Sequence, residues 1–510
     1  MNSLSYKTKV LSVILTLLLS VSEAGHSSFC QIWQTDIQKS ENDVKVSRNY
    51  KGLWLSQKCE IHPGPRFMLR RYHIKNGQFN LIRYYYMDPW CTTASFSVLA
   101  VGSFSPPPEK ASSSSISWVV PGGIELDFSF KKVAIVPFTT EAARSLSQMV
   151  NISCPNLNLR PWRPFRKYKV LSYDEQRNRK RSFRSGLTND FDCTRNFDFN
   201  FNELLLTRLE HRSSLRFLSQ KTHSKMLRRH SSHLFLGVEG SRRGSRPTYY
   251  QEPLLLAQTE NCAICLNLVK SSWQKGIKSP PTLAVSYDTS PPRTGLEGQW
   301  ISLRCEVRPY GLFLYRTFIF GYENQGWQAQ HSYFKDPQCL NPMFTLSAKG
   351  TYYPGPPSSI IEDAVEYDFH IKESFLTPHD KQFSDNLNGL LNCGSGTKWQ
   401  VGQIGNLTSS GGCEELGIIV PSVEEDLVRF EKLSPDLVYL YLGETPDGKT
   451  RPTSFQPPLV RCSSPESNRE EDHLFNYNEI QPLPLISGSY SARVSYLMSF
   501  LLVTLTFMKL

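Results

Sequence analysis

Apolar and polar residues alternate one by one along two similar stretches of the chain. Each stretch places four apolar residues between single polar ones: Ile124, Leu126, Phe128 and Phe130 in the first, and Val365, Tyr367, Phe369 and Ile371 in the second. A period of two is typical of a β-strand with one apolar and one wet face. Both stretches are therefore predicted to be strands whose apolar face covers a core or lines a cavity.

A second pair of predicted strands precedes the first pair and follows the same rule. Its apolar positions are Phe96, Val98 and Ala100 in one stretch, and Phe344, Leu346 and Ala348 in the other. A long antiparallel sheet hides its apolar face by closing on itself. We therefore predict a mainly β protein with two tandem homologous antiparallel β-barrel or half-barrel domains, with a β-sandwich as the alternative. Alternation alone does not distinguish a filled barrel from one with a ligand cavity.

The predicted strands belong to a unit that occurs twice. Gly52-Leu53-Trp54-Leu55-Ser56 with Cys59-Glu60 corresponds to Gly298-Gln299-Trp300-Ile301-Ser302 with Cys305-Glu306. Asp88-Pro89 before Cys91 corresponds to Asp336-Pro337 before Cys339, and Arg246-Pro247-Thr248 corresponds to Arg451-Pro452-Thr453. One copy per roughly 200 residues indicates duplicated domains rather than a solenoid. We assign residues 25–275 to the first repeat, 276–295 to a linker and 296–463 to the second repeat.

The two ends of the chain predict secretion and tethering. Residues 1–24 have basic residues, an apolar run and a small-residue end, which predicts a secretory signal peptide, with a membrane anchor as the alternative. Residues 464–492 are polar and predict a stalk. Residues 493–510 predict either a single-pass transmembrane helix or the removable tail of a lipid-anchor signal. The body of the protein is therefore expected outside the cell at the plasma membrane, where Asn151 and Asn406 stand in N-glycosylation triplets.

The first repeat carries a strongly basic insertion, at about residues 160–246. The stretch from Asn202 to Leu218 has helical character, so a helical basic insertion is predicted. Two interpretations stay open: a solvated loop, or a docking face for sulfated glycans or anionic headgroups. The net charge of +11 favours extracellular polyanions over nucleic acid.

The chain contains twelve cysteines, which are expected to form disulfides on the secretory route. The repeat predicts Cys59–Cys91 with Cys305–Cys339, and Cys154–Cys193 with Cys393–Cys413. The odd count in each repeat predicts a bridge between the repeats. Cys30 and Cys462 are then expected to pair with one each of Cys262 and Cys265. Cys262 and Cys265 alone do not make a metal or redox site: a structural zinc needs four ligands, and no second Cys-x-x-Cys or His-x-x-x-His pair occurs in the sequence.

Motifs for catalysis or for a cofactor are absent from the sequence. It has no nucleophile elbow, zinc-protease helix, phosphate loop or dinucleotide fingerprint. We therefore expect a binding protein rather than an enzyme, with no cofactor or metal. An extracellular hydrolase remains the alternative, because catalytic triads are spatial and leave no obligatory local motif.

The repeated motifs resemble the family of adenomatosis polyposis coli down-regulated 1. The resemblance rests on Gly-x-Trp-x-Ser-x-x-Cys-Glu at Gly52 and Gly298, Asp-Pro-x-Cys at Asp88 and Asp336, and the Arg-Pro-Thr segments that end both copies. It implies a membrane-tethered, glycosylated inhibitor of Wnt signalling with two β-barrel-like domains. Such a protein is expected to capture Wnt proteins, in part through their acyl chain, and to keep them from Wnt receptors and co-receptors.

The resemblance and the alternation together give candidate residues for an acyl pocket. They are Phe96, Val98, Ile124, Leu126, Phe128 and Phe130 in the first repeat, and Phe344, Leu346, Val365, Tyr367, Phe369 and Ile371 in the second. The competing hypothesis is a heparan-sulfate-binding or adhesive surface glycoprotein, which the basic insertion favours. The sequence leaves open which repeat binds and whether the protein forms a homodimer.

Overall fold

The computed structural model describes residues 29–462, except for 156–160, 174–190, 198, 216–227, 240–243, 258–267, 270–278, 284–294, 322–324, 391, 395–397, 435–436 and 445–449. The predicted signal peptide, stalk and C-terminal segment lie outside the described residues, as do Cys262, Cys265 and most of the predicted linker. No helix in the described part of the chain combines the length and the apolar character needed to cross a bilayer.

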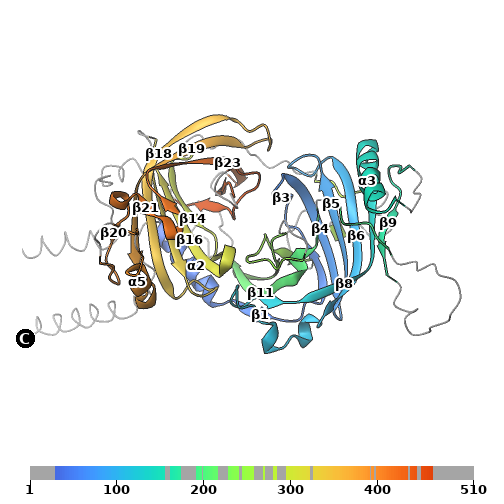
Figure 1. Cartoon of the computed structure of the whole chain (residues 1–510), viewed down its shortest axis with the longest axis horizontal. Helices are drawn as coiled ribbons and strands as arrows, with labels where there is room; N and C mark the ends of the chain where they lie inside the picture. The colour runs from blue at the N-terminus through green and yellow to red at the C-terminus, as the bar shows by residue number, and fades with distance from the viewer. Residues whose placement is uncertain are drawn as a thin grey trace, which may run out of the picture.

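The first sheet closes into an antiparallel barrel of eight strands, at the right in Figure 1. Strands β2, β4, β5, β6 and β8 follow one another, and β11, β12 and β13 lead back to β2. On the other side only two residue pairs, Leu206 with Glu125 and Thr207 with Ile124, join β11 to β7, which leads into β8. The strands of this sheet are β1 (Lys45–Ser47), β2 (Gly52–Leu55), β3 (Glu60–His62), β4 (Arg66–Lys75), β5 (Gln78–Tyr86), β6 (Ala94–Ser105), β7 (Ile124–Glu125), β8 (Asp127–Pro137), β9 (Tyr168–Ser172), β10 (Phe191–Asp192), β11 (Leu206–Leu215), β12 (Arg228–Leu236) and β13 (Leu254–Leu256).

The second sheet closes in the same way, through β14, β16, β17, β18, β19, β23, β24 and β25. The β7–β11 pairing, which we call the seam of the first barrel, corresponds to the pairing of β19 with β23. This second pairing is longer and runs from Val365–Val428 to Ile371–Ser422. The strands are β14 (Gly298–Ser302), β15 (Glu306–Arg308), β16 (Leu312–Phe320), β17 (Gly326–Phe334), β18 (Pro342–Pro357), β19 (Val365–Pro378), β20 (Gly405–Asn406), β23 (Ser422–Ser434), β24 (Leu437–Leu442) and β25 (Leu459–Arg461), with β21 (Gly412–Cys413) and β22 (Ile418–Ile419) forming a separate ribbon.

Matching residues of the two repeats make matching contacts. The indole N–H of Trp54 donates to the Tyr50 carbonyl, and that of Trp300 donates to the Leu296 carbonyl. The cysteines that follow the two Asp-Pro motifs, Cys91 and Cys339, both have positive φ, 55° and 53°. The sequence prediction of two homologous antiparallel barrels is therefore confirmed.

The N-terminal helix α2 lies on the second barrel, although it precedes the first in sequence (Figure 1). This position brings Cys30 to Cys462, and the two form a disulfide with a Cα–Cα distance of 4.9 Å. The predicted bridge between the repeats is thus present, but its predicted partners, Cys262 and Cys265, were wrong. The helices are α2 (Phe29–Asn42), α3 (Thr140–Ser153) and α5 (Lys381–Leu387), with 3-10 turns at Pro108–Lys110, Ser113–Ser115, Asn202–Leu205, Pro309–Gly311, Thr408–Ser410 and Glu414–Leu416.

The four disulfides predicted from the repeat are confirmed. They join Cys59 to Cys91, Cys305 to Cys339, Cys154 to Cys193, and Cys393 to Cys413.

The prediction of a helical basic insertion was wrong in its second half. Only Asn202–Leu205 forms a 3-10 turn, and the chain then continues as β11 and β12. These strands correspond to β23 and β24, because β11-β12-β13 closes the first barrel as β23-β24-β25 closes the second. The Leu-x-Arg-x-Glu pattern of β11 recurs in β23 as Leu427-Val428-Arg429-Phe430-Glu431.

Two arginines of β11, Arg208 and Arg212, form buried ion pairs. Arg212 donates to both carboxylate oxygens of Glu41, at 3.1 and 3.0 Å, and also to Glu210. Burial alone would raise the pKa of Glu210, but Arg212 and Arg208 lower it to about 2. This part of the insertion therefore belongs to the scaffold.

Candidate functional site

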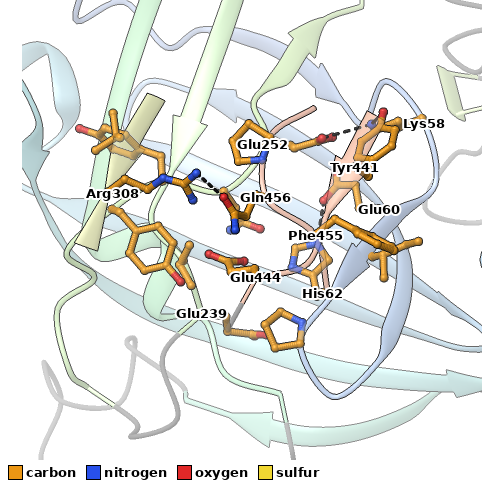
Figure 2. Close-up of a pocket in the computed structure, with 18 of the residues that line it drawn as sticks. Lys58, Glu60, His62, Glu239, Glu252, Arg308, Tyr441, Glu444, Phe455 and Gln456 are labelled. Carbon is orange, nitrogen blue, oxygen red and sulfur yellow. Dashed lines mark hydrogen bonds and ion pairs between the residues drawn. The ribbon is translucent and has the colours of Figure 1, made fainter. Parts of the chain in front are cut away.

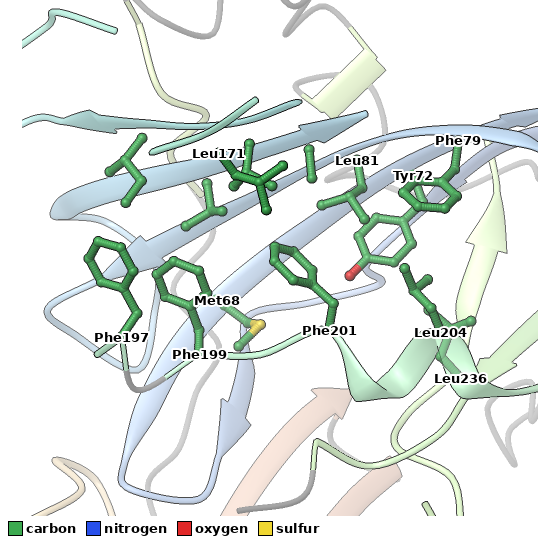
Figure 3. Close-up of a cluster of buried hydrophobic side chains, with 14 of the residues drawn as sticks. Met68, Tyr72, Phe79, Leu81, Leu171, Phe197, Phe199, Phe201, Leu204 and Leu236 are labelled. Atoms are coloured by element: carbon green, nitrogen blue, oxygen red, sulfur yellow. The ribbon is translucent and has the colours of Figure 1, made fainter. Parts of the chain in front are cut away.

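One apolar cluster fills much of the interior of the first barrel. Strand alternation turns Met68 and Tyr72 of β4 and Phe79 and Leu81 of β5 inward, where each is at most 2 % exposed. Figure 3 shows these side chains facing three phenylalanines of the segment Phe197–Phe201. Burying each large apolar side chain contributes about 1.5–3 kcal/mol. The cluster therefore stabilises the barrel and provides an apolar wall.

Charged residues inside this barrel form paired networks. Arg70 holds the carboxylate of Glu60 at 2.8 Å, and the guanidinium of Arg83 pairs with Glu203 and Glu239. Burial alone would raise the pKa of Glu60, but Arg70 and His62 lower it to about 2. A buried charge without a partner is costly, so these pairs fix the positions of the segments that carry them.

Arg83 fixes the segment Phe197–Phe201 within the barrel. Its Nη1 donates to the Asn200 carbonyl at 2.7 Å, and its guanidinium lies 4.5 Å from the centre of the Phe201 ring. The Asn200 amide in turn donates to Glu239 at 3.0 Å. Three alternate phenylalanines, Phe197, Phe199 and Phe201, are thereby held against the inner wall, each at most 8 % exposed.

One pocket lies between this segment and helix α3, and we call it the helix-side pocket. It has a volume of about 360 Å³. Its wall includes the stacked rings of Tyr85 and Phe96, with centroids 4.5 Å apart, and its rim includes Met87, which is 59 % exposed. The apolar lining is Phe67, Tyr85, Met87, Phe96, Ala142, Leu146, Met149, Phe197 and Phe199.

Helix α3 is positioned over this pocket by its cap and its apolar face. Thr139 accepts the amide of Ala142 at 3.1 Å, which satisfies one of the free N–H groups of the first turn. Leu146 and Val150 are buried against the barrel, and the disulfide of Cys154 follows the last turn. Ala142, one turn into the helix, leaves the space in front of Phe96 unfilled.

A second pocket, of about 450 Å³, lies near the short β7–β11 seam, and we call it the seam pocket. Phe128 and Phe130 of β8 and Phe201 of the aromatic segment line it. Phe130 and Phe201 are in ring contact, with centroids 4.6 Å apart. Asp127 and Arg246, paired at 2.7 Å, contribute polar groups to its lining.

The second barrel fills the place that corresponds to the helix-side pocket. Asp380 caps α5 by accepting the Phe383 amide at 3.0 Å, as Thr139 does for Ala142. Phe383 therefore stands where the first repeat has Ala142. Its ring stacks on Phe344 at 4.4 Å, and Phe344 stacks on Tyr333 at 4.4 Å.

The predicted acyl-pocket residues lie in five different surroundings. Phe96 lines the helix-side pocket, and Phe128 and Phe130 line the seam pocket. Val98, Ile124 and Leu126 are at most 4 % exposed and fill the core of the first barrel. In the second repeat, Phe344 and Leu346 pack beneath α5 with Trp399, whereas Tyr367, Phe369 and Ile371 pack in or against the central cluster of that barrel. Val365 is half-buried and pairs with Val428 of β23.

Sequence reasoning missed the residues that set the shape of both pockets. Phe197, Phe199 and Phe201 alternate with polar residues, so the period of two was present in the sequence but was assigned to the basic insertion. No pattern in the sequence marks Ala142, because its correspondence to Phe383 depends on the equivalent caps of α3 and α5.

A third, polar cavity of about 80 Å³ lies between the barrels (Figure 2). Lys58 of the first barrel pairs with Glu252 at 3.2 Å and contacts Tyr441 of the second, with its ammonium 4.4 Å from the ring centre. Burial raises the pKa of Glu444 in the same cavity. A volume this small holds only a few water molecules, well below the roughly 300–1,000 Å³ of ligand pockets. This cavity therefore belongs to the junction of the barrels.

Both predicted glycosylation sites are on the surface. Asn151, in the last turn of α3, and Asn406, in β20, are exposed. Their modification stays a prediction. Among the residues that the structure describes, no three histidines, cysteines or acids are grouped so as to hold a metal ion.

Comparison with known families gives one match that covers most of the chain. The model of the family described as adenomatosis polyposis coli down-regulated 1 matches residues 30–284 and, a second time, residues 283–470. The two matches coincide with the two barrels.

Proposed function

Because the chain belongs to the adenomatosis polyposis coli down-regulated 1 family, we propose that it is an extracellular, membrane-tethered inhibitor of Wnt signalling that binds Wnt proteins. In this proposal the first barrel shelters the acyl chain of the Wnt protein. A chain held there is withheld from Wnt receptors, which accounts for inhibition without an enzymatic step.

The observation that carries the proposal is the helix-side pocket. It combines a volume of about 360 Å³, an aromatic and aliphatic wall and a rim at the exposed Met87. Ligand pockets of roughly 300–1,000 Å³ with mainly apolar walls are the usual sites of small apolar ligands. Helix α3, which lines this pocket, lies on the side of the first barrel that faces away from the second (Figure 1). A protein-bound acyl chain can therefore enter without displacing the other domain.

The energy available is sufficient for tight binding. Each buried methylene contributes about 0.8 kcal/mol, so a chain of sixteen carbons gains on the order of 10 kcal/mol before the costs of ordering. The pocket walls are held by the Arg83 network and by α3, so little of this energy is needed to organise the protein. The seam pocket, on the other side of Phe201, offers space for the distal part of the chain.

Binding of an acylated Wnt peptide and of the same peptide without its acyl group tests this proposal, with the whole extracellular protein in solution. We expect the acylated form to bind at least about 100-fold more tightly, since burying even four methylenes contributes about 3 kcal/mol. A free fatty acid should compete. Equal affinity for the two peptides would contradict acyl capture.

A further inference from the structure

Five cations lie together on the outer edge of the first barrel, and we call them the cationic strip. Lys132 is on β8, and Arg163, Arg166, Lys167 and Lys169 are on β9 or the loop before it; all five are exposed. Residues 161–173 contain no acid. Figure 1 shows β9 beside α3, on the side of the first barrel that faces away from the second.

The strip gathers like charges closely enough to affect one another. Strand pairing sets Lys169 opposite Ala134, two residues from Lys132. Burial lowers the pKa of Lys167, and the charges of Lys169 and Lys132 lower it further. Like charges on adjacent strands destabilise a sheet. Repulsion between these cations lowers the stability of the free protein, and a bound polyanion would offset it.

The backbone that carries the strip is held in place. The Phe165 amide donates to the Pro137 carbonyl at 2.8 Å, and the Arg163 amide donates to the Tyr168 hydroxyl at 2.7 Å. The Trp162 and Tyr168 rings are stacked with centroids 4.2 Å apart. A ligand therefore meets cations on a preformed frame, which reduces the ordering cost of binding.

The second barrel has the same frame without the charges. Gly402, with φ of 79°, donates to the Pro378 carbonyl at 2.8 Å, as Phe165, with φ of 59°, does to Pro137. Aligned on this contact, neutral Gln400, Gln403 and Asn406 stand where the first barrel has Arg163, Arg166 and Lys169. Lys132 corresponds to Glu373, which pairs with Lys349 at 2.9 Å. The charges are thus a property of one copy and not a requirement of the fold.

We propose that the cationic strip binds a sulfated glycosaminoglycan chain. Four of the five cations fall within residues 163–169, a stretch without an acid, and this concentration of exposed positive charge suits a polyanion. A bilayer surface fits less well, because peripheral membrane binding needs a broad apolar face, and among residues 161–173 the large exposed apolar side chains are only Phe165 and Tyr173. The proposal moves the docking face away from β11, whose Arg208 and Arg212 are in buried ion pairs.

Heparin binding by the whole extracellular protein tests this assignment. The variant Arg163→Gln/Arg166→Gln/Lys169→Asn gives the strip the residues of the second barrel. We expect its heparin affinity to fall at least about tenfold, and the slope of log affinity against log salt to decrease by about two units, because fewer counterions are released. Lys132→Glu should weaken binding in the same direction.

The matched control Lys45→Gln/Lys51→Gln/Lys75→Gln removes three exposed positive charges elsewhere on the same barrel. It should change heparin affinity less than about twofold, since these charges are dispersed. Equal losses in the two triple variants, or a strip variant that keeps heparin binding but loses binding to phosphatidylserine vesicles, would overturn the proposal. Acylated-peptide binding should be unchanged in the strip variant, so this test is independent of the proposed function.

Discussion

The two barrels share a scaffold and differ at the end covered by the helix. In the first, Ala142 leaves a pocket in front of Phe96; in the second, Phe383 stacks on Phe344 and occupies that place. The helix caps, the stacked Tyr–Phe pairs and the disulfides are otherwise equivalent. One side chain per repeat thus separates an open pocket from a filled position on the same fold.

A second difference lies deeper in the barrel. Arg83 of β5 corresponds to His331 of β17, which is half-buried; desolvation and the charge of Arg316 lower its pKa to about 3. Only the first barrel has the segment Phe197–Phe201, and Arg83 holds it. Arg83 therefore ties the aromatic segment to the inner wall of the first barrel, at a position where the second barrel has a histidine.

Arg83→His gives the first barrel the residue that the second barrel has at this position. We expect it to lower the free energy of unfolding more than the other substitutions below. It leaves the buried Glu203 without its guanidinium, which typically costs about 3–5 kcal/mol. Chemical denaturation should show this loss, and acylated-peptide binding should fall because Phe199 and Phe201 are released. The control Arg144→His, at an exposed position on α3, should change stability by less than about 0.5 kcal/mol. Similar behaviour of the two variants would show that Arg83 does not hold the wall.

The stabilities of the two barrels are also expected to change in opposite directions as the pH rises. In the second, burial raises the pKa of Asp426 to about 7, so the stability due to its neutral form is present below pH 4 and lost as pH rises through 7. In the first, Glu60 has a pKa of about 2, so its contribution is present above pH 4.5 and lost as pH falls toward 2.

Asp426→Asn tests this contrast, because asparagine can still accept the amides of Leu427 and Gly443 but cannot ionise. The variant should be more stable than the parent at pH 8 by about 2–4 kcal/mol, at about 1.4 kcal/mol per pH unit, and equal to it near pH 4. A difference that does not vary with pH would contradict the assigned pKa.

Phe383→Ala removes the side chain that fills the second barrel. Because Phe383 is only partly buried, we expect a loss of about 2–3 kcal/mol, less than for a fully buried phenylalanine. A fluorescent fatty acid should gain a second, weaker binding site in this variant. Unchanged stoichiometry would show that other side chains also close this end.

The period-two pattern and the cysteine spacing were sufficient to predict the two barrels and four disulfides. Strand alternation and repeated motifs are local, and they translate directly into sheet faces and loop closures. The partner of Cys462 was not predictable, because it depends on α2 lying on the second barrel, a long-range contact without a local pattern. The helical prediction for Asn202–Leu218 failed because barrel closure overrides the propensity of a leucine-rich stretch.

The candidate site was predictable only in part. Alternation identified Phe96, Phe128 and Phe130, which line pockets, but also Val98 and Leu126, which fill the core. Period two shows which face of a strand is apolar, whereas a cavity depends on what stands opposite that face. Here the opposite side is formed by α3 and the segment Phe197–Phe201, whose positions follow from buried ion pairs and a disulfide.

Binding of an acylated Wnt peptide to the Ala142→Phe variant tests the central claim most directly. This substitution gives the first barrel the side chain of the second, and the pocket has room for it, so the thermal midpoint should stay within a few degrees of the parent. The account predicts that acylated-peptide affinity falls at least about tenfold while the non-acylated peptide is unaffected. A folded Ala142→Phe protein that binds the acylated peptide at full strength would contradict capture in the helix-side pocket.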